Sequence, residues 1–177
     1  MAGGGATLGP NGWTCNEITP DPPRVNGHGV PYVLAQSSAP SAVTGTTGET
    51  TLVTIPIAAG SFVTSGQRLR VSFNATCTNN ANAKTFRARL GGTQILQLSS
   101  SFTSMSGGRV YFDLVATGAA GQKCLNGVAS YGTAAGASVG TSAINMAAAQ
   151  SLTLTCQLAV GTDTFQIEDY SAEVLNS

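Results

Sequence analysis

Apolar and polar residues alternate one by one along much of the chain after residue 49. In RLRVSFNATC, residues 68 to 77, every second residue is apolar, and Arg68 and Arg70 fall on the polar side. Successive side chains of a β-strand point to opposite faces, so a period of two indicates a strand with one buried and one wet face. TFRARL repeats the pattern, with Arg87 and Arg89 on the polar side.

The same pattern predicts eight strands, separated by turns of small residues. Gly91-Gly92 supplies the positive φ angles of a tight hairpin turn, and Pro56 indicates that the first strand lies at a sheet edge or ends there. The apolar positions change parity between Ile167 and Tyr170, which predicts a β-bulge near Glu168-Asp169. Residues 133–150 read as a long loop with at most a short helix over INMAAAQ. The predicted strands are 50–57, 68–77, 85–90, 93–100, 109–116, a weaker one at 124–132, 151–160 and 164–175.

Residues 1–45 have a different character and are expected to form an extended N-terminal arm. They contain six of the seven prolines, the only Trp and the only His, without a sustained period. Proline and glycine at this density prevent a continuous helix or a central strand. The apolar residues are too many for a solvated tail, so the segment is expected to lie in a groove of another chain. The expected anchors are Trp13, Ile18, Val25, Tyr32 and Leu34.

The fold class expected from these elements is all-β. Eight antiparallel strands with one apolar face commonly form a two-sheet jelly roll. The prediction is therefore a jelly-roll-like β-sandwich over residues 46–177, following the arm at 1–45. Strand count alone does not fix the connectivity, so an immunoglobulin-like sandwich is an alternative.

Charge narrows the range of functions. Charged residues are 9% of the chain and the formal net charge is zero, whereas roughly a quarter of the residues in an ordinary soluble domain are charged. No global field attracts the chain to nucleic acid or to anionic lipid, and no apolar run is long enough to cross a bilayer. The beginning of the sequence lacks the features of a signal peptide. These features favour an assembled protein made in a cytoplasm, with no nucleic-acid or membrane partner.

Chemical motifs are sparse, and we predict no catalytic residue, cofactor or metal site. His28 is the only histidine and lies in the arm, where a local hydrogen bond is a simpler role than catalysis. Glu168 and Asp169 are neighbours on a strand, which makes them a poor acid/base pair unless the bulge turns both outward. The cysteines are too far apart in the sequence for a thiolate metal site and are expected to be free thiols in the core. A disulfide between two of them is the alternative. They are Cys15, Cys77, Cys124 and Cys156.

Three segments resemble a small β-sandwich domain that is widespread among virion proteins of tailed bacteriophages. They are ETTLVTIPIAAGSF, NNANAKTFRARLGGTQILQ and SLTLTCQLAVGTDTFQIEDYSAEVL, and the resemblance covers roughly residues 48–175. The sequence departs from the pattern at IPIAAG and in the final acidic cluster. The resemblance implies a homotrimeric capsid decoration (cement) protein, a head fibre or a tail-fibre module.

One further feature of the sequence suggests a function, namely a set of four outward-facing arginines: Arg68, Arg70, Arg87 and Arg89. If their strands are neighbours, the four guanidinium groups share one patch, which is either a solvated face or a contact with another subunit or the capsid. The expected carboxylate partners from a neighbouring chain are Glu49, Asp113, Glu168, Asp169 and Glu173.

The leading hypothesis is a non-enzymatic decoration protein on the capsid surface of a virion. It would form a homotrimer and bind the major capsid protein through its arm. The alternative is a head- or tail-fibre module that binds a host receptor or glycan through the loop at residues 117–149, with Tyr131 as a contact.

Overall fold

The computed structural model describes residues 31–103, 106–126 and 138–175, together with the backbone of four short stretches at 7–9, 12–14, 24–25 and 28–29. Regular structure in these ranges is entirely β. No helix in them is long and apolar enough to cross a membrane. The strands are β1 (Thr7–Gly9), β2 (Gly12–Thr14), β3 (Arg24–Val25), β4 (His28–Gly29), β5 (Tyr32–Ser37), β6 (Ser41–Val43), β7 (Thr50–Ile57), β8 (Arg68–Cys77), β9 (Asn80–Leu90), β10 (Thr93–Phe102), β11 (Gly107–Gly118), β12 (Gly121–Asn126), β13 (Ser138–Ser142), β14 (Gln150–Leu158) and β15 (Phe165–Leu175).

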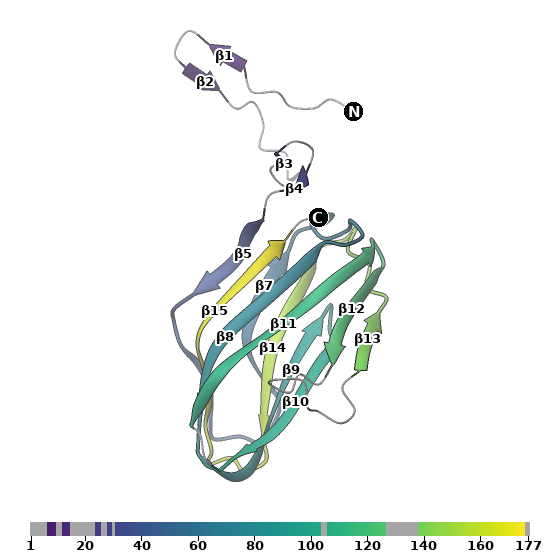
Figure 1. Ribbon diagram of the computed structural model, residues 1–177. Helices are drawn as coiled ribbons and strands as arrows, with labels where there is room; N and C mark the ends of the chain where they lie inside the picture. Colours follow the sequence, from purple (N-terminus) through teal and green to yellow (C-terminus); the bar gives the residue numbers. More distant parts are fainter. Residues whose placement is uncertain are drawn as a thin grey trace.

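Two antiparallel sheets pack face to face into a sandwich (Figure 1). The four-stranded sheet has the order β10-β9-β14-β7, and the seven-stranded sheet has the order β13-β12-β11-β8-β15-β5, with β6 also paired to β15. We number the eight main strands 1 to 8 from β5 onward, leaving out β6 and the β12–β13 hairpin. In this numbering the seven-stranded sheet has the order 1-8-3-6 and the four-stranded sheet has the order 2-7-4-5. This is the connectivity of a jelly roll. The prediction of an all-β, antiparallel, jelly-roll-like sandwich is confirmed.

The first strand of the jelly roll lies N-terminal to the boundary predicted at residue 45. Strand β5 pairs with β15 from Tyr32↔Val174 to Ser37↔Tyr170. Strand β6 pairs with the beginning of β15, and Val43 at its end is buried in the core. Residues 32–43, which the sequence analysis assigned to the arm, are therefore part of the seven-stranded sheet. The prolines made this strand hard to predict, because only eight residues lie between Pro31 and Pro40, and the six of them that form β5 are too few to show a clear period of two.

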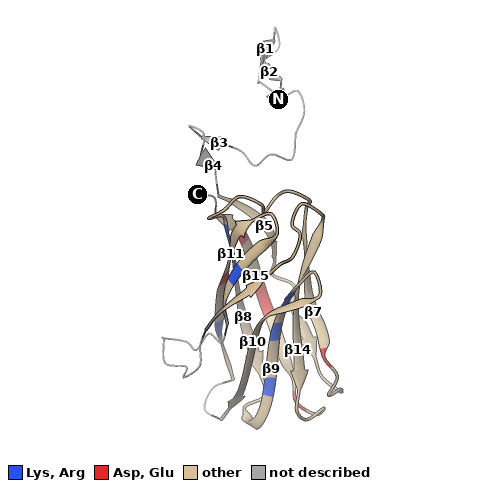
Figure 2. Ribbon diagram, turned by 90° about the vertical axis from the view of Figure 1, so that its right-hand side faces the viewer, with Lys and Arg blue, Asp and Glu red and all other residues tan. Residues whose placement is uncertain are grey.

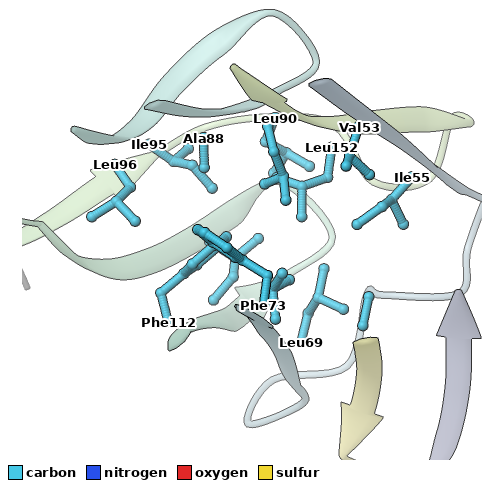
Figure 3. Close-up of a cluster of buried hydrophobic side chains, with 14 of the residues drawn as sticks. Val53, Ile55, Leu69, Phe73, Ala88, Leu90, Ile95, Leu96, Phe112 and Leu152 are labelled. Carbon is cyan, nitrogen blue, oxygen red and sulfur yellow. The ribbon is translucent and has the colours of Figure 1, made fainter. Parts of the chain in front are cut away.

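The core lies between the inner faces of the two sheets. Figure 3 shows Leu69, Phe73 and Phe112 of the seven-stranded sheet facing side chains of the four-stranded sheet, among them Leu90 and Leu152. The rings of Phe73 and Phe86 lie 4.9 Å apart between centroids, in a tilted arrangement that joins β8 to β9 across the sandwich. Aromatic pairs favour such geometry over parallel face-to-face stacking.

Local features predicted from sequence are mostly confirmed. Gly91 and Gly92 have φ angles of 54° and 81° in the hairpin between β9 and β10. Pro56 lies on β7, an edge strand. The pairing of β15 with β8 shifts register between Ile167 and Asp169, which is the predicted bulge. The expected short helix over 144–150 is wrong: this segment is a turn that leads into β14, and Met146 in it is fully buried.

A buried ion pair closes one end of the sandwich. The side chains of Lys84 and Asp163 are 0% and 4% exposed, and Lys84 Nζ lies 3.2 Å from Asp163 Oδ2. The ammonium also donates to Asn80 Oδ1 at 2.5 Å and to the Asn82 carbonyl at 3.0 Å, so each of its three protons has an acceptor. Asp163 in turn accepts from the side-chain amides of Asn80 and Asn82.

This network ties the beginning of β9 to the loop between β14 and β15. Burial disfavours the ionised carboxyl, but the hydrogen bonds from Asn80, Asn82 and Lys84 outweigh it, so the pKa of Asp163 lies below its usual value. A buried pair of this kind is a weak source of net stability when intact, but removal of one partner leaves a buried charge uncompensated.

We expect Lys84→Met to lower the unfolding temperature by about 5 °C or more, because Asp163 then loses its only cationic partner in this network. The matched control is Gln94→Met on β10, where the glutamine is exposed and a change within about 2 °C is expected. Differential scanning calorimetry of both variants measures this. Equal small shifts in the two would contradict the role given to the network.

Candidate functional site

The four predicted arginines do not share one patch. Strand β8, with Arg68 and Arg70, belongs to the seven-stranded sheet, whereas β9, with Arg87 and Arg89, belongs to the four-stranded sheet. All four point outward, as the alternation predicted, but onto opposite outer faces of the sandwich. The single arginine patch expected for neighbouring strands is therefore wrong, because the chain crosses between the sheets after Cys77 instead of forming a hairpin there.

On the seven-stranded sheet, Asp113 of β11 binds both arginines of β8. Arg70 Nε donates to Asp113 Oδ1 at 2.9 Å, and Arg68 Nη1 donates to Oδ2 at 2.7 Å. Burial acts against ionisation of Asp113, but hydrogen bonds from the two arginines prevail and hold the pKa of this carboxyl below its usual value. The hydrogen bond from Arg70 to Asp113 likewise raises the pKa of Arg70. Asp113 was expected as a partner from a neighbouring chain and is instead a partner within the chain.

On the four-stranded sheet, Glu49 has the corresponding role. Arg89 donates to both carboxylate oxygens of Glu49 at 2.8 Å, and Thr155 Oγ1 donates to Oε1 at 2.6 Å. Arg87 Nη1 lies 3.5 Å from Glu49 Oε2. The hydrogen bond from Arg89 is the main cause that lowers the pKa of Glu49 to about 2. Glu49 is thus also a partner within the same chain.

The bulge in β15 turns two consecutive carboxylates onto the same outer face. Asp169 accepts from the Asn74 amide at 2.8 and 3.1 Å. Glu168 accepts from the hydroxyl of Thr76 and, at 2.8 Å, from the amide of Gln166. The hydrogen bond from Thr76 is the main cause that lowers the pKa of Glu168. These contacts use neutral donors, so neither carboxylate has an ion-pair partner among the described residues.

The outer face of the seven-stranded sheet collects an unusual share of the charge. Of the eight basic and eight acidic residues in the chain, four of each sign lie on it. Figure 2 shows basic and acidic residues marked along this sheet. We call this surface the charged face. Its charged members are Arg68, Arg70, Arg109, Asp113, Lys123, Glu168, Asp169 and Glu173.

The charged face also exposes large apolar groups. Tyr111 on β11 and Val33 on β5 are 61% and 52% exposed, and they are two of the three large hydrophobic residues exposed in the described part of the chain. The register places Tyr111 opposite Ser72, and Val33 opposite Glu173. Tyrosine and arginine are enriched at surfaces that contact protein, and the charged face exposes both.

The predicted arm anchors divide into two groups. Tyr32 and Leu34 lie on β5 and pack, half-buried, against the core of their own chain. Burial raises the pKa of Tyr32. The side chains of Trp13, Ile18 and Val25 lie outside the described residues, and so do the side chains of His28 and Tyr131.

The cysteines that the structure describes are consistent with the core role predicted for them. Cys124 and Cys156 are buried, Cys77 is half-buried, and no disulfide joins these three. Burial raises the pKa of Cys124 to about 11 and that of Cys156 to about 12. Within the described ranges, no group of three His, Cys, Asp or Glu side chains is arranged to hold a metal ion.

Sequence reasoning missed two features of the charged face. It did not weigh Tyr111, Arg109 or Lys123, although alternation along β11 places the first two on the side opposite Phe112. It also expected only a weak strand, at 124–132, within a loop over 117–149, where the structure has the β12–β13 hairpin beside β11. That hairpin brings Lys123 to the face, and the weak period of CLNGVASYG gave little sign of it.

No family model matches the sequence, and no curated protein matches it. Solved structures with some likeness include dimeric latent PorU from Porphyromonas gingivalis, at 12% identity and a TM-score of 0.40, with 83% of this chain and 12% of that chain covered. The EclA C-terminal domain, described as a sugar-binding protein, has 12% identity and a TM-score of 0.34, with 94% and 88% covered. The winged bean acidic lectin, complexed with methyl-α-D-galactose, has 11% identity and a TM-score of 0.35, with 97% and 90% covered.

The chain spans about an eighth of the PorU chain. Two of these three proteins are β-sandwiches named for sugar binding, and the present chain is weakly similar to them. Likeness at this level assigns no ligand to the chain.

We expect Glu49→Gln to cost about 1 kcal/mol of unfolding free energy at pH 7, the size of a solvent-screened surface pair. Because the pKa of Glu49 falls from 4.5 to about 2 on folding, its ionisation stabilises the folded state fully above about pH 5. That stabilisation is lost as the pH falls toward 2. Urea unfolding of both proteins at pH 7 and pH 2.5 measures the difference, and an undiminished difference at pH 2.5 would contradict this account.

Proposed function

We propose that this chain is a non-enzymatic structural protein of a bacteriophage virion. In this proposal it forms a homotrimer, decorates the capsid surface and binds the major capsid protein through residues N-terminal to β5. Two independent lines support the proposal. One is the resemblance of the sequence to tailed-phage virion domains, which extends over most of the sandwich. The other is the charged face, which is suited to contact with protein.

The charged face is the observation that carries the proposal. A protein with only 9% charged residues places half of them on one open sheet face, beside Tyr111 and Val33. Charges spread for solubility would be distributed over the whole surface. Their concentration on one sheet face, together with exposed tyrosine and arginine, favours specific contact with a protein of complementary charge.

The arginines retain a part in this proposal, but not as first expected. Arg68 and Arg70 belong to the charged face, where Asp113 fixes their guanidinium planes. Arg87 and Arg89 are fixed by Glu49 on the opposite face, which leaves that face for contact with the shell or with solvent. Carboxylates that orient arginines in advance reduce the entropy lost when the arginines meet a partner.

Decoration would stabilise the shell by mass action. A protein that binds only the assembled shell shifts the assembly equilibrium toward it, by an amount that rises with the occupancy of its sites. The sandwich supplies a rigid body for this purpose, and the residues before β5 supply the attachment.

We expect the purified chain to have a native mass of three times 17.8 kDa by light scattering coupled to size exclusion. A variant that lacks residues 1–30 should still be a trimer of the shortened chain, because β5 and the rest of the sandwich remain, but should no longer sediment with shells of the major capsid protein. The full-length chain is the matched control. A monomer at all concentrations, or undiminished sedimentation of the truncated variant, would contradict the proposal.

The alternative, a fibre module that binds a host glycan, has a different signature. It predicts that the full-length chain binds glycans on an array and does not bind shells. Binding of that kind would replace the decoration role.

A further inference from the structure

We infer that the charged face is the seam between copies of this chain, and that it closes head to tail. The carboxylates of β15 in one copy meet the basic groups of β11 and β12 in the next. This inference rests on the proposed homotrimer and specifies which residues form its contacts.

The two signs of charge are segregated on the charged face. One side, on β15, has Glu168, Asp169 and Glu173, which we call the acidic strip. The other side, on β11 and β12, has Arg109 and Lys123, which we call the basic strip. Between them, Asp113 offsets only one of the two charges of Arg68 and Arg70. The acidic strip thus carries three negative charges and the basic strip two positive charges, with one further positive charge on β8, where Arg70 lies opposite Glu173.

The acidic strip is held in place but is not neutralised. Glu168 and Asp169 accept hydrogen bonds from Thr76, Gln166 and Asn74, which are all neutral. Glu173 accepts a hydrogen bond from Ser171 at 2.9 Å, and the charge of Arg70 is near enough to affect it only through space. Oriented carboxylates without a bound cation are ready to accept a guanidinium or ammonium from outside.

The two strips are too far apart to compensate each other within one copy. Strand β8 lies between β15 and β11, and neighbouring strands are about 4.8 Å apart, so the strips are separated by roughly 10 to 14 Å. This exceeds the Debye length of about 8 Å at physiological salt. A second copy can bring opposite charges within about 3 Å, where a charge-assisted hydrogen bond forms.

The dimensions of the face limit what area alone can contribute. Its five neighbouring strands, β12, β11, β8, β15 and β5, contain 6, 12, 10, 11 and 6 residues, which at about 3.3 Å per residue and about 4.8 Å per strand cover roughly 700 Å². A standard protein interface buries about 800 Å² on each partner, and a ring divides the face between two seams, so each seam depends on its charge pairs and on Tyr111. Tyr111, on β11 two residues from Arg109 in the basic strip, is available as an aromatic anchor of the kind enriched at interface centres.

Head-to-tail closure is the way of pairing complementary strips that is consistent with the homotrimer proposed above. Each copy has one acidic strip and one basic strip, on opposite sides of the face. A closed ring uses one of each at every seam and leaves none unused, and three copies are the number proposed above.

The test reverses each strip separately and then both together. We expect Glu168→Lys with Glu173→Lys to weaken assembly at least tenfold, since like charges then meet at the seam. Arg109→Glu with Lys123→Glu should do the same. The chain with all four substitutions should assemble again, because the strip on β15 then has a net positive charge, with Asp169 unchanged, and the strip on β11 and β12 is negative, so opposite signs meet again. The readout is native mass by light scattering over a range of concentrations, with circular dichroism to verify folding.

The matched control places two lysines on the opposite face of the sandwich, by Thr54→Lys and Gln94→Lys, where both residues are exposed. This variant should assemble like the original chain. If the original chain is a trimer and the single-strip reversals are trimers too, the seam lies elsewhere while the proposed trimer stands. If the original chain is a monomer, both the seam and the trimer are wrong. A dimer that the reversals dissociate would mean a two-fold pairing of this face and would overturn head-to-tail closure.

Discussion

The packing of two sheets against each other is the constraint on which the rest of this structure depends. Every main strand gives one face to the shared core, so side chains such as Phe73 and Phe86 meet across the sandwich. The other face of each strand is then left without a packing role. Whatever the protein does with other molecules is set by what those outer faces carry. In this chain they carry most of the few charges, arranged by register rather than by sequence proximity.

Because the chain has few charged residues, the position of each one on the sandwich is informative about its role. Lys84 and Asp163 are used inside, to lock one end of the sandwich, and Glu49 fixes two arginines on the four-stranded sheet. Both sets of contacts are satisfied within the chain. The charged face differs, because three carboxylates on it have neutral donors alone among the residues that the structure describes. A second molecule is the natural source of the missing cations, and the chain itself provides a complementary set.

Much of the fold was predictable because alternation reports directly which side of a strand is buried. The outward direction of the arginines, the Gly91-Gly92 turn and the bulge before Asp169 followed from local sequence. Connectivity did not, since the same period describes a strand that forms a hairpin and one that crosses to the other sheet. The misplaced arginine patch came from that ambiguity at the end of β8. Strand β5 was missed because its pairing depends on β15, which lies more than 130 residues away.

The most direct measurement of the central claim is the solvent accessibility of Tyr111 in the protein in solution. Hydroxyl-radical footprinting followed by mass spectrometry reports the oxidation rate of this ring as the protein is concentrated. If the charged face is the seam between copies, Tyr111 is oxidised readily in dilute solution and becomes protected as the assembly forms. A rate that stays high in the fully assembled protein would place the seam on another surface and contradict the account.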